Sequence, residues 1–220
     1  MSIHYSPTTV TNGLVLSLDA GNSKSYPGSG TTWTDLSGNG NHGTLINGPT
    51  FNSANGGSIV FDGVDDYNTF SATIANAIGT GNFTLNAWVK APSVLNNYRI
   101  IFSTTQYYMY LATMDSGFTF DTISNQTFRF GATIISGTWY SCTVVRSSNI
   151  DYGYKNGVLV GSKADSTVPS GNFDVGRTTS FGGDNYYFSS SLAGLTFYNR
   201  ALSAAEISQN FNALRGRYGV

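Results

Sequence analysis

Apolar and polar residues alternate along short stretches of this chain, and glycine, proline or asparagine interrupts the alternation about every eight to twelve residues. A period of two predicts strands whose side chains point to the two faces of a sheet in turn. We therefore expect many short antiparallel strands joined by tight turns, as in a sandwich. The predicted strands cover residues 13–19, 58–61, 83–90, 99–103, 107–112, 118–122, 127–130, 138–146, 151–155, 158–162 and 195–198.

One segment near the C-terminal end has helical spacing instead. Ser203 and Glu206 are placed to form a capping box, in which each side chain bonds the backbone N–H of the other residue. Ile207, Phe211 and Leu214 recur at i, i+4 and i+7 and so form one apolar stripe. We expect a short helix that packs on the strands as a terminal latch.

Two local patterns are specific. Asn156-Gly157 lies between two β-prone runs, which predicts a type I′ hairpin because both central residues need a positive φ. Alternation along 139–146 places Cys142 on one face with other apolar residues, so we expect it to be a buried, inert thiol. Trp88 and Trp139 lie in strongly apolar strands and are predicted to be buried in the core.

Composition restricts the function classes. Charged residues make up 10% of the chain, against roughly 25% in an average soluble domain, and the net charge is −1. No basic surface is therefore available to bind a nucleic-acid backbone. The longest apolar runs are far below the roughly 20 residues that span a bilayer, so we expect no membrane insertion.

The 220 residues suffice for one sizeable β domain and are short for two. We expect a single domain over residues 1–220, with residues 1–12 as an extended N-terminal arm. One cysteine excludes an intrachain disulfide. The first residues contain neither a basic start nor an apolar stretch, which predicts no signal peptide and synthesis in a reducing cytoplasm.

The segment 38–43 matches the dinucleotide-binding pattern G-x-G-x-x-G. That pattern binds a pyrophosphate only when a strand precedes it and a helix follows it. Here an extended stretch that ends at Pro49 follows, so we expect the glycines to form left-handed turns.

Residues for catalysis are scarce. Glycoside hydrolysis needs two carboxylates on either side of the bond, but the only glutamate, Glu206, is assigned to the helix cap. The two histidines, His4 and His42, are expected in a flexible end and a glycine loop, which leaves almost no candidate base for a Ser-His-Asp arrangement. We therefore expect a protein that is not an enzyme and has no catalytic residues.

The densest acidic cluster contains Asp62, Asp65 and Asp66. Carboxylate oxygens are the ligands that calcium prefers, so these three residues are the candidate metal ligands. The alternative is that they accept backbone N–H bonds within their own turn. No other cofactor is expected.

Tyrosines are too numerous for all of them to be buried. Exposed tyrosine beside asparagine and serine can stack on a sugar ring or form part of a protein interface. Composition does not separate these two roles. The candidate ligand-binding residues are Tyr108, Tyr110, Tyr152, Tyr154, Tyr186 and Tyr187.

Six motifs follow one another in an order that resembles the laminin-G-like, concanavalin A-like lectin/glucanase domains. They are 37–44 (SGNGNHGT), 61–67 (FDGVDDY), 83–89 (FTLNAWV), Trp139, 154–157 (YKNG) and 197–207 (FYNRALSAAEI). Segments 13–22 and 209–219 are most similar to versions in structural proteins of tailed bacteriophages, particularly marine ones.

The resemblance implies an all-β jelly-roll sandwich of two curved antiparallel sheets, with one short C-terminal helix. It also implies that the Asp-Asp-Tyr segment contributes to a calcium site at the rim. The sequence departs from the pentraxin relatives, which have an acidic and amide run after the glycine of a late strand. Here Gly176 is followed by Arg177, and Gly194 is followed by Leu195 rather than an acidic residue. These changes remove ligands that the pentraxin relatives use for calcium, so the resemblance does not imply a pentraxin-type calcium site here.

Three hypotheses follow. The first is a non-enzymatic structural or decoration protein of a phage virion, which is made in the host cytoplasm and attaches to other virion proteins and to copies of itself. The second is a dedicated carbohydrate-binding adhesion module, associated with a tail or fibre, for host-surface glycans. The third and most remote is a glycoside hydrolase.

Overall fold

The computed structural model describes residues 7–70, 74, 81–93, 99–104, 110–114, 117–121, 128–130, 133–166, 173–181 and 184–220. For residues 110–114, 121, 179–181 and 184–185 the description covers the backbone.

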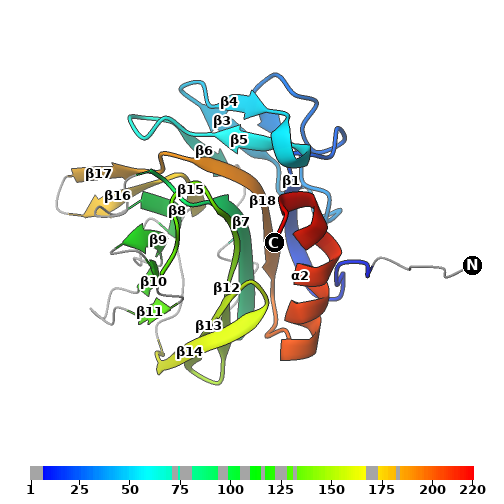
Figure 1. Ribbon diagram of the computed structural model, residues 1–220, viewed down its shortest axis with the longest axis vertical. Helices are drawn as coiled ribbons and strands as arrows, with labels where there is room; N and C mark the ends of the chain where they lie inside the picture. The colour runs from blue at the N-terminus through cyan, green and yellow to red at the C-terminus, as the bar shows by residue number, and fades with distance from the viewer. Residues whose placement is uncertain are drawn as a thin grey trace, which may run out of the picture.

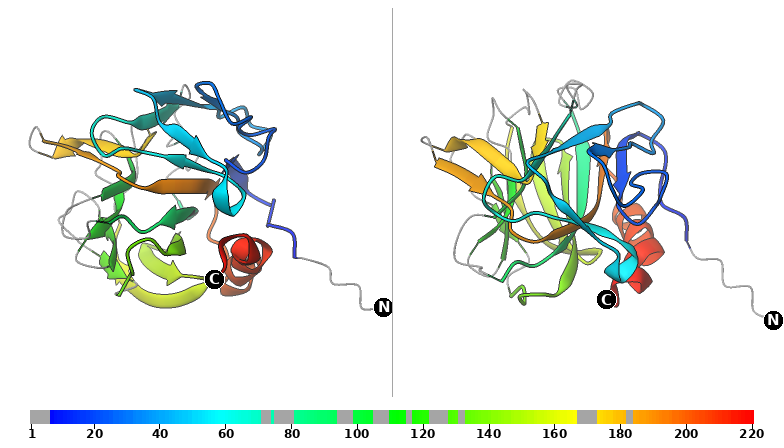
Figure 2. Two further views of the ribbon diagram at one scale, coloured as in Figure 1. Left: turned by 45° about the horizontal axis from the view of Figure 1, so that its top comes forward. Right: turned by 90° about the horizontal axis from the view of Figure 1, so that it is seen from above.

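Two antiparallel sheets lie face to face (Figures 1 and 2). In the first sheet, β18 pairs with β7 along one edge and with both β5 and β1 along the other. The strand order of the first sheet is β14 (Val158–Ala164), β13 (Ile150–Lys155), β12 (Trp139–Ser147), β7 (Phe83–Lys90), β18 (Ser191–Tyr198), β5 (Ser58–Val60) and β4 (Thr50–Asn52), with β1 (Leu14–Asp19) beside β18.

The second sheet also has eight strands, and a separate two-stranded hairpin lies against it at β8. The order of the second sheet is β11 (Phe128–Phe130), β10 (Gly117–Asp121), β9 (Tyr110–Met114), β8 (Arg99–Thr104), β15 (Phe173–Val175), β6 (Tyr67–Phe70), β3 (Gly43–Ile46) and β2 (Thr32–Trp33). The hairpin consists of β16 (Arg177–Phe181) and β17 (Asp184–Tyr187).

The core between the sheets is aromatic. The rings of Phe102 and Phe173, from neighbouring strands of the second sheet, stack with centroids 5.3 Å apart. Phe173 also meets Phe197 of the first sheet edge-on at 5.9 Å. Burial of such side chains is the dominant favourable term in folding.

Alternate residues of strand β12 pack on the two faces of the first sheet, one toward the core and one toward the outside. Cys142 and Val144 belong to the core between the sheets, while Val145 and Trp139 lie on the outer face of the first sheet. The predicted burial of Cys142 is confirmed, and burial raises the pKa of its thiol far above the ordinary value. The outer face is buried too, because a helix covers it.

That helix is α2 (Ala204–Tyr218), on the right in Figure 1. Both hydrogen bonds of the predicted Ser203–Glu206 capping box are present. Trp88 stacks on Phe211 and Tyr218 of the helix, with ring centroids 5.7 and 4.3 Å apart. Trp88 and Trp139 are therefore buried as predicted, but beneath the helix rather than between the sheets.

Residues 7–12 lie along α2 and β18. The backbone N–H of Val10 donates to Asn210 Oδ1 at 2.8 Å, and the Tyr198 hydroxyl donates to the Val10 carbonyl at 3.0 Å. The helix C-terminus is held by Arg217, whose guanidinium binds both oxygens of Asp19. No helix of the described residues combines the length and the apolarity that crossing a membrane requires.

The all-β sandwich with one C-terminal helix is confirmed. At the predicted type I′ turn, Asn156 and Gly157 have φ of 51° and 77°. The 38–43 segment contains left-handed glycines and leads into a strand, not a helix. Seven short strands were not predicted from the pattern of residues: β2, β3, β4, β6, β15, β16 and β17. Of the predicted strand 107–112, residues 107–109 lie outside the described part of the chain.

Candidate functional site

The acidic turn between β5 and β6 lies at the rim of the sandwich. The carboxylates of Asp62, Asp65 and Asp66 approach within 4.8 Å of one another. Asp62 Oδ1 accepts the N–H of Val64 at 2.8 Å, and Asp66 Oδ2 accepts the N–H of Asp62 at 3.0 Å. Hydrogen bonds within the turn, which were the alternative to metal binding, are therefore present.

The three carboxylates differ in exposure. Asp66 is only 4% exposed, whereas Asp62 and Asp65 face solvent. Burial, together with the neighbouring charges of Asp62 and Asp65, raises the pKa of Asp66, while the N–H of Asp62 acts against this rise. Calcium usually takes six to eight oxygen ligands, so these residues would supply only part of a calcium site. Calcium binding stays a prediction.

Gly176 joins β15 to β16 and lies against this turn. A Cβ at Gly176 would be 2.9 Å from the Phe61 ring and 3.4 Å from the carbonyl oxygen of Asp66. Its φ of 88° also favours glycine over other residues. The close approach of Gly176 brings Arg177 beside the acidic turn. Arg177 is the residue that stands where the pentraxin relatives have an acidic and amide run.

Arg177 is held between an acidic and an aromatic partner. Its Nε binds Asp174 Oδ2 at 2.9 Å, and its guanidinium carbon lies 3.4 Å from the centre of the Tyr67 ring. Stacking of this kind is typical of arginine and leaves polar hydrogens at the edge of the plane. The Arg177 side chain is 22% exposed and so remains accessible from solvent.

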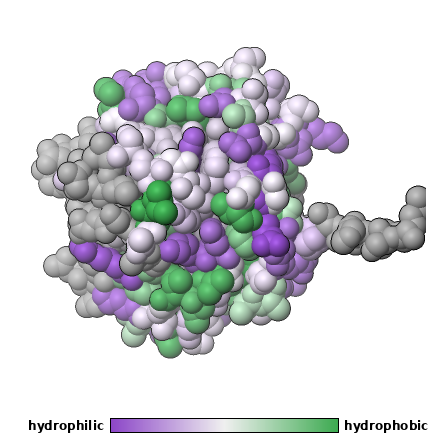
Figure 3. All heavy atoms as spheres, in the orientation of Figure 1, coloured by the Kyte–Doolittle hydropathy of each residue, from purple (hydrophilic) through white to green (hydrophobic). Residues whose placement is uncertain are grey.

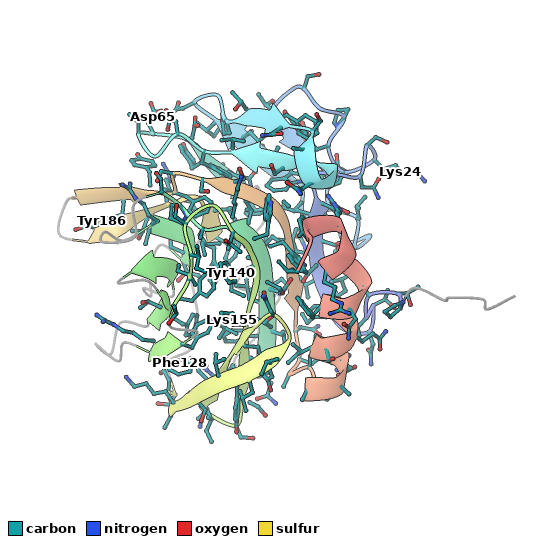
Figure 4. The ribbon with its side chains drawn as sticks, in the orientation of Figure 1. Lys24, Asp65, Phe128, Tyr140, Lys155 and Tyr186 are labelled. Carbon is teal, nitrogen blue, oxygen red and sulfur yellow. The ribbon has the colours of Figure 1, made fainter. Side chains whose placement is uncertain are left out.

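Tyr187 lies directly opposite Arg177 in the β16–β17 hairpin. Cross-strand partners point to the same face, so the rim carries Tyr67, Arg177 and Tyr187 together. All three are partly exposed. Tyr186, opposite Thr178, lies with Asp65 toward the same end of the molecule (Figure 4). We call Tyr67, Arg177, Tyr187 and the acidic turn the rim site.

The other predicted tyrosines lie elsewhere. Tyr152 and Tyr154 are in β13 on the outer face of the first sheet, where they line a shallow hollow of about 510 Å³ beside the start of α2. Tyr108 lies outside the described residues, as does the side chain of Tyr110. Among the four candidates whose side chains the structure describes, Tyr187 belongs to the rim site, and Tyr186 is its neighbour in β17. Tyr67 and Arg177 were not among the predicted binding residues, although Tyr67 belongs to the Asp-Asp-Tyr segment.

Outside the acidic turn, every carboxylate whose side chain is described has a structural partner. Asp35 accepts three backbone N–H groups, from Ser17, Ser37 and Asn41. The remaining carboxylates bind arginines, in the pairs Asp19–Arg217, Asp151–Arg146, Asp165–Arg146, Asp174–Arg177 and Glu206–Arg200.

Two of these pairs show opposite pKa shifts. Burial raises the pKa of Asp151, although the bond from Arg146 acts in the other direction. The bond from Arg200 lowers the pKa of Glu206 to about 2. Arg146 binds both Asp151 and Asp165, and Arg200 binds Glu206.

Comparison with known proteins places the chain in a family. Residues 61–208 match the laminin-G-type family model described as the concanavalin A-like lectin/glucanases superfamily. The match covers more than half of the chain, so this protein belongs to that family. No curated protein matches the sequence.

Solved structures agree on the fold. A mutant of Trypanosoma rangeli sialidase that displays trans-sialidase activity superposes with a TM-score of 0.73 at 16% identity, over 95% of this chain and 34% of that one. The binding domain of Paraclostridial Mosquitocidal Protein 1 gives a TM-score of 0.71 at 15% identity, over 92% of this chain and 52% of that one. This chain thus corresponds to a third to a half of those proteins, and the similarity concerns the fold alone.

Proposed function

We propose that this protein is a non-enzymatic recognition module with a lectin-like fold that serves as a structural or decoration protein of a phage virion. The non-enzymatic assignment depends on one observation: the carboxylates are already bound by other groups of the protein. Each described carboxylate outside the rim site is bound by an arginine or by backbone N–H groups. The rim site instead offers partly exposed aromatic and cationic side chains, which suit binding.

The virion assignment rests on the resemblance of segments 13–22 and 209–219 to phage structural proteins. In this proposal the protein is made in the host cytoplasm and resides in the virion. Its partners are other virion proteins and copies of itself, with no nucleic acid and no membrane insertion. Edge strands support association, because low charge leaves them poorly protected against pairing with another chain.

The alternative is a dedicated adhesion module for host-surface glycans. The juxtaposition of Tyr67, Arg177 and Tyr187 favours it, because a sugar ring can stack on tyrosine while guanidinium N–H groups bind its hydroxyls. In this alternative the acidic turn beside them is the candidate calcium site.

A reconstruction of an intact particle tests the first assignment. We expect many copies in a symmetric arrangement, with the rim site facing the medium. Absence of the chain from purified particles would contradict the virion role.

A binding assay on host-surface polysaccharide tests the alternative. Tyr67→Ala with Tyr187→Ala should abolish any binding, whereas Tyr152→Ala, a partly exposed tyrosine on the first sheet, should not. The same polysaccharide incubated with purified protein should release no sugar. Release that stops in Asp66→Asn would support a hydrolase and overturn the non-enzymatic assignment.

A further inference from the structure

A row of polar side chains crosses the outer face of the first sheet beneath α2. Thr143, Asn86, Thr196 and Ser17 are successive cross-strand partners on β12, β7, β18 and β1. The row separates two apolar clusters under the helix. One cluster contains Tyr198, Val145 and Ile207, and the other contains Trp88, Trp139 and Tyr218.

Polar groups between a helix and a sheet are costly unless they are hydrogen-bonded. At the β12 end the row is satisfied, since Asn86 Nδ2 donates to Thr143 Oγ1 and to Ser141 Oγ, both at 2.7 Å. Toward β1 the row becomes accessible to solvent. Asn86 and Thr196 are partly exposed although β7 and β18 are interior strands of a helix-covered sheet.

The exposure has a cause: the row opens into a cavity of about 300 Å³ between α2, the sheet and residues 7–12. Ser17, Thr196 and Asn86 lie at its floor, and Asn210 comes from the helix. Thr9 and Thr11 come from the N-terminal segment, and Leu14 and Leu36 add apolar surface. The cavity thus combines apolar walls with several hydroxyl and amide groups, as small-molecule sites do.

Charge narrows the class of ligand. The charged residues that line the cavity are Asp19 and Arg217, and they bind each other through two contacts of 2.7 and 3.0 Å. The pair leaves no net charge to attract an ion. Hydroxyl and amide groups around an apolar wall match a molecule with hydroxyls at its edge and C–H groups on its faces.

We propose that this cavity binds one neutral sugar ring, at a site separate from the rim. Its volume is at the lower end of the range of about 300 to 1,000 Å³ found for ligand pockets, which suits a single ring rather than a chain. In this site the Ser17 and Thr196 hydroxyls and the Asn86 amide oxygen bind ligand hydroxyls, because Asn86 Nδ2 already donates to Thr143 and Ser141. Trp88 lines the same cavity and lies beneath the helix, so it reports on occupancy.

The test titrates the full chain with glucose, galactose, mannose and the N-acetyl derivatives of glucosamine and galactosamine, up to about 0.1 M. Binding is followed by tryptophan fluorescence and by ligand-observed NMR. We expect at least one sugar to bind saturably. The double variant Ser17→Ala with Thr196→Val should weaken that binding by about tenfold or more. Thr44→Val, a surface change on the second sheet, is the matched control and should leave it unchanged.

Three results would overturn the proposal. They are no saturable binding of any of these sugars, equal binding by the double variant while its circular dichroism is unchanged, or binding lost in Tyr67→Ala. The last result would move the site to the rim and support the glycan-binding alternative. If the double variant fails to fold, a crystal structure of the wild-type protein with the sugar decides, because density elsewhere than in this cavity contradicts the assignment.

Discussion

The outer faces of the two sheets use similar aromatic residues in opposite ways. On the first sheet, Trp88 and Tyr218 are 3% and 5% exposed and stack on each other. On the second sheet and the hairpin beside it, Tyr67 and Tyr187 remain partly exposed near Arg177. Figure 3 shows one view of the surface, where apolar and polar residues are interspersed rather than gathered into a single large patch. The difference teaches that a covering helix, not residue type, decides whether these rings contribute to stability or to contact.

The largest expected effect is that of Trp88→Ala. The change removes a buried ring and its stacking contacts with Phe211 and Tyr218, so the free energy of unfolding should fall by about 3 to 5 kcal/mol. Urea denaturation measures it. Tyr187→Ala at the rim is the matched aromatic control and should cost about 1 kcal/mol or less. Equal losses of unfolding free energy in the two variants would show that the helix-covered ring contributes no more to stability than the exposed one.

A smaller, pH-dependent effect is expected for Glu206→Gln at the start of α2. The folded-state pKa of Glu206 is about 2, below its ordinary value of 4.5. The carboxylate therefore stabilises the fold above pH 4.5, and this contribution is lost as the pH falls through about 2. Since the ion pair with Arg200 is partly exposed, solvent screening limits the loss to about 1 kcal/mol at neutral pH. Melting curves of both proteins should converge near pH 2; a constant gap would contradict the assignment.

At the rim, Arg177→Lys should lower the free energy of unfolding by only about 0.5 to 1 kcal/mol. Lysine keeps the charge near Asp174 but lacks the plane that stacks on Tyr67. Arg215→Lys is the control, because its guanidinium carbon lies 6.0 Å from the Phe211 ring and the residue is exposed. Thermal melts should separate the two variants in that order.

The smallest effect is expected for Asp65→Asn. Removing one charge relieves repulsion with Asp62 and Asp66, so without calcium the protein should gain a few tenths of a kcal/mol. Melts in chelator and in calcium measure this gain. If calcium stabilises the wild type and this variant loses the effect, the acidic turn is a metal site.

Local chemistry explains which elements could be predicted. The capping box, the Asn-Gly turn and the alternation along β12 depend on neighbours in sequence, and all three are confirmed. The strands that were missed are mostly short, and β6 and β15 exist because each pairs with strands far away in sequence. Their residues contain no periodic signal of useful length.

The candidate sites were harder to predict than the fold, because they too depend on contacts between residues far apart in sequence. Alternation places Trp88 and Trp139 on one face of the first sheet, but only the position of α2 decides that this face is covered. The contact of Gly176 with Asp66, which creates the rim site, joins segments more than a hundred residues apart. Composition could indicate surplus tyrosine without indicating which tyrosines meet.

Residues 7–12 and α2 lie together on one side of the molecule, whereas the β16–β17 hairpin extends from the other (Figures 1 and 2). An anchor or fusion partner joined near either of these segments would therefore attach the domain by one side. The hairpin would then point away from the point of attachment. Display on a bead, a carrier protein or a larger assembly through these segments should leave the opposite end free for contact.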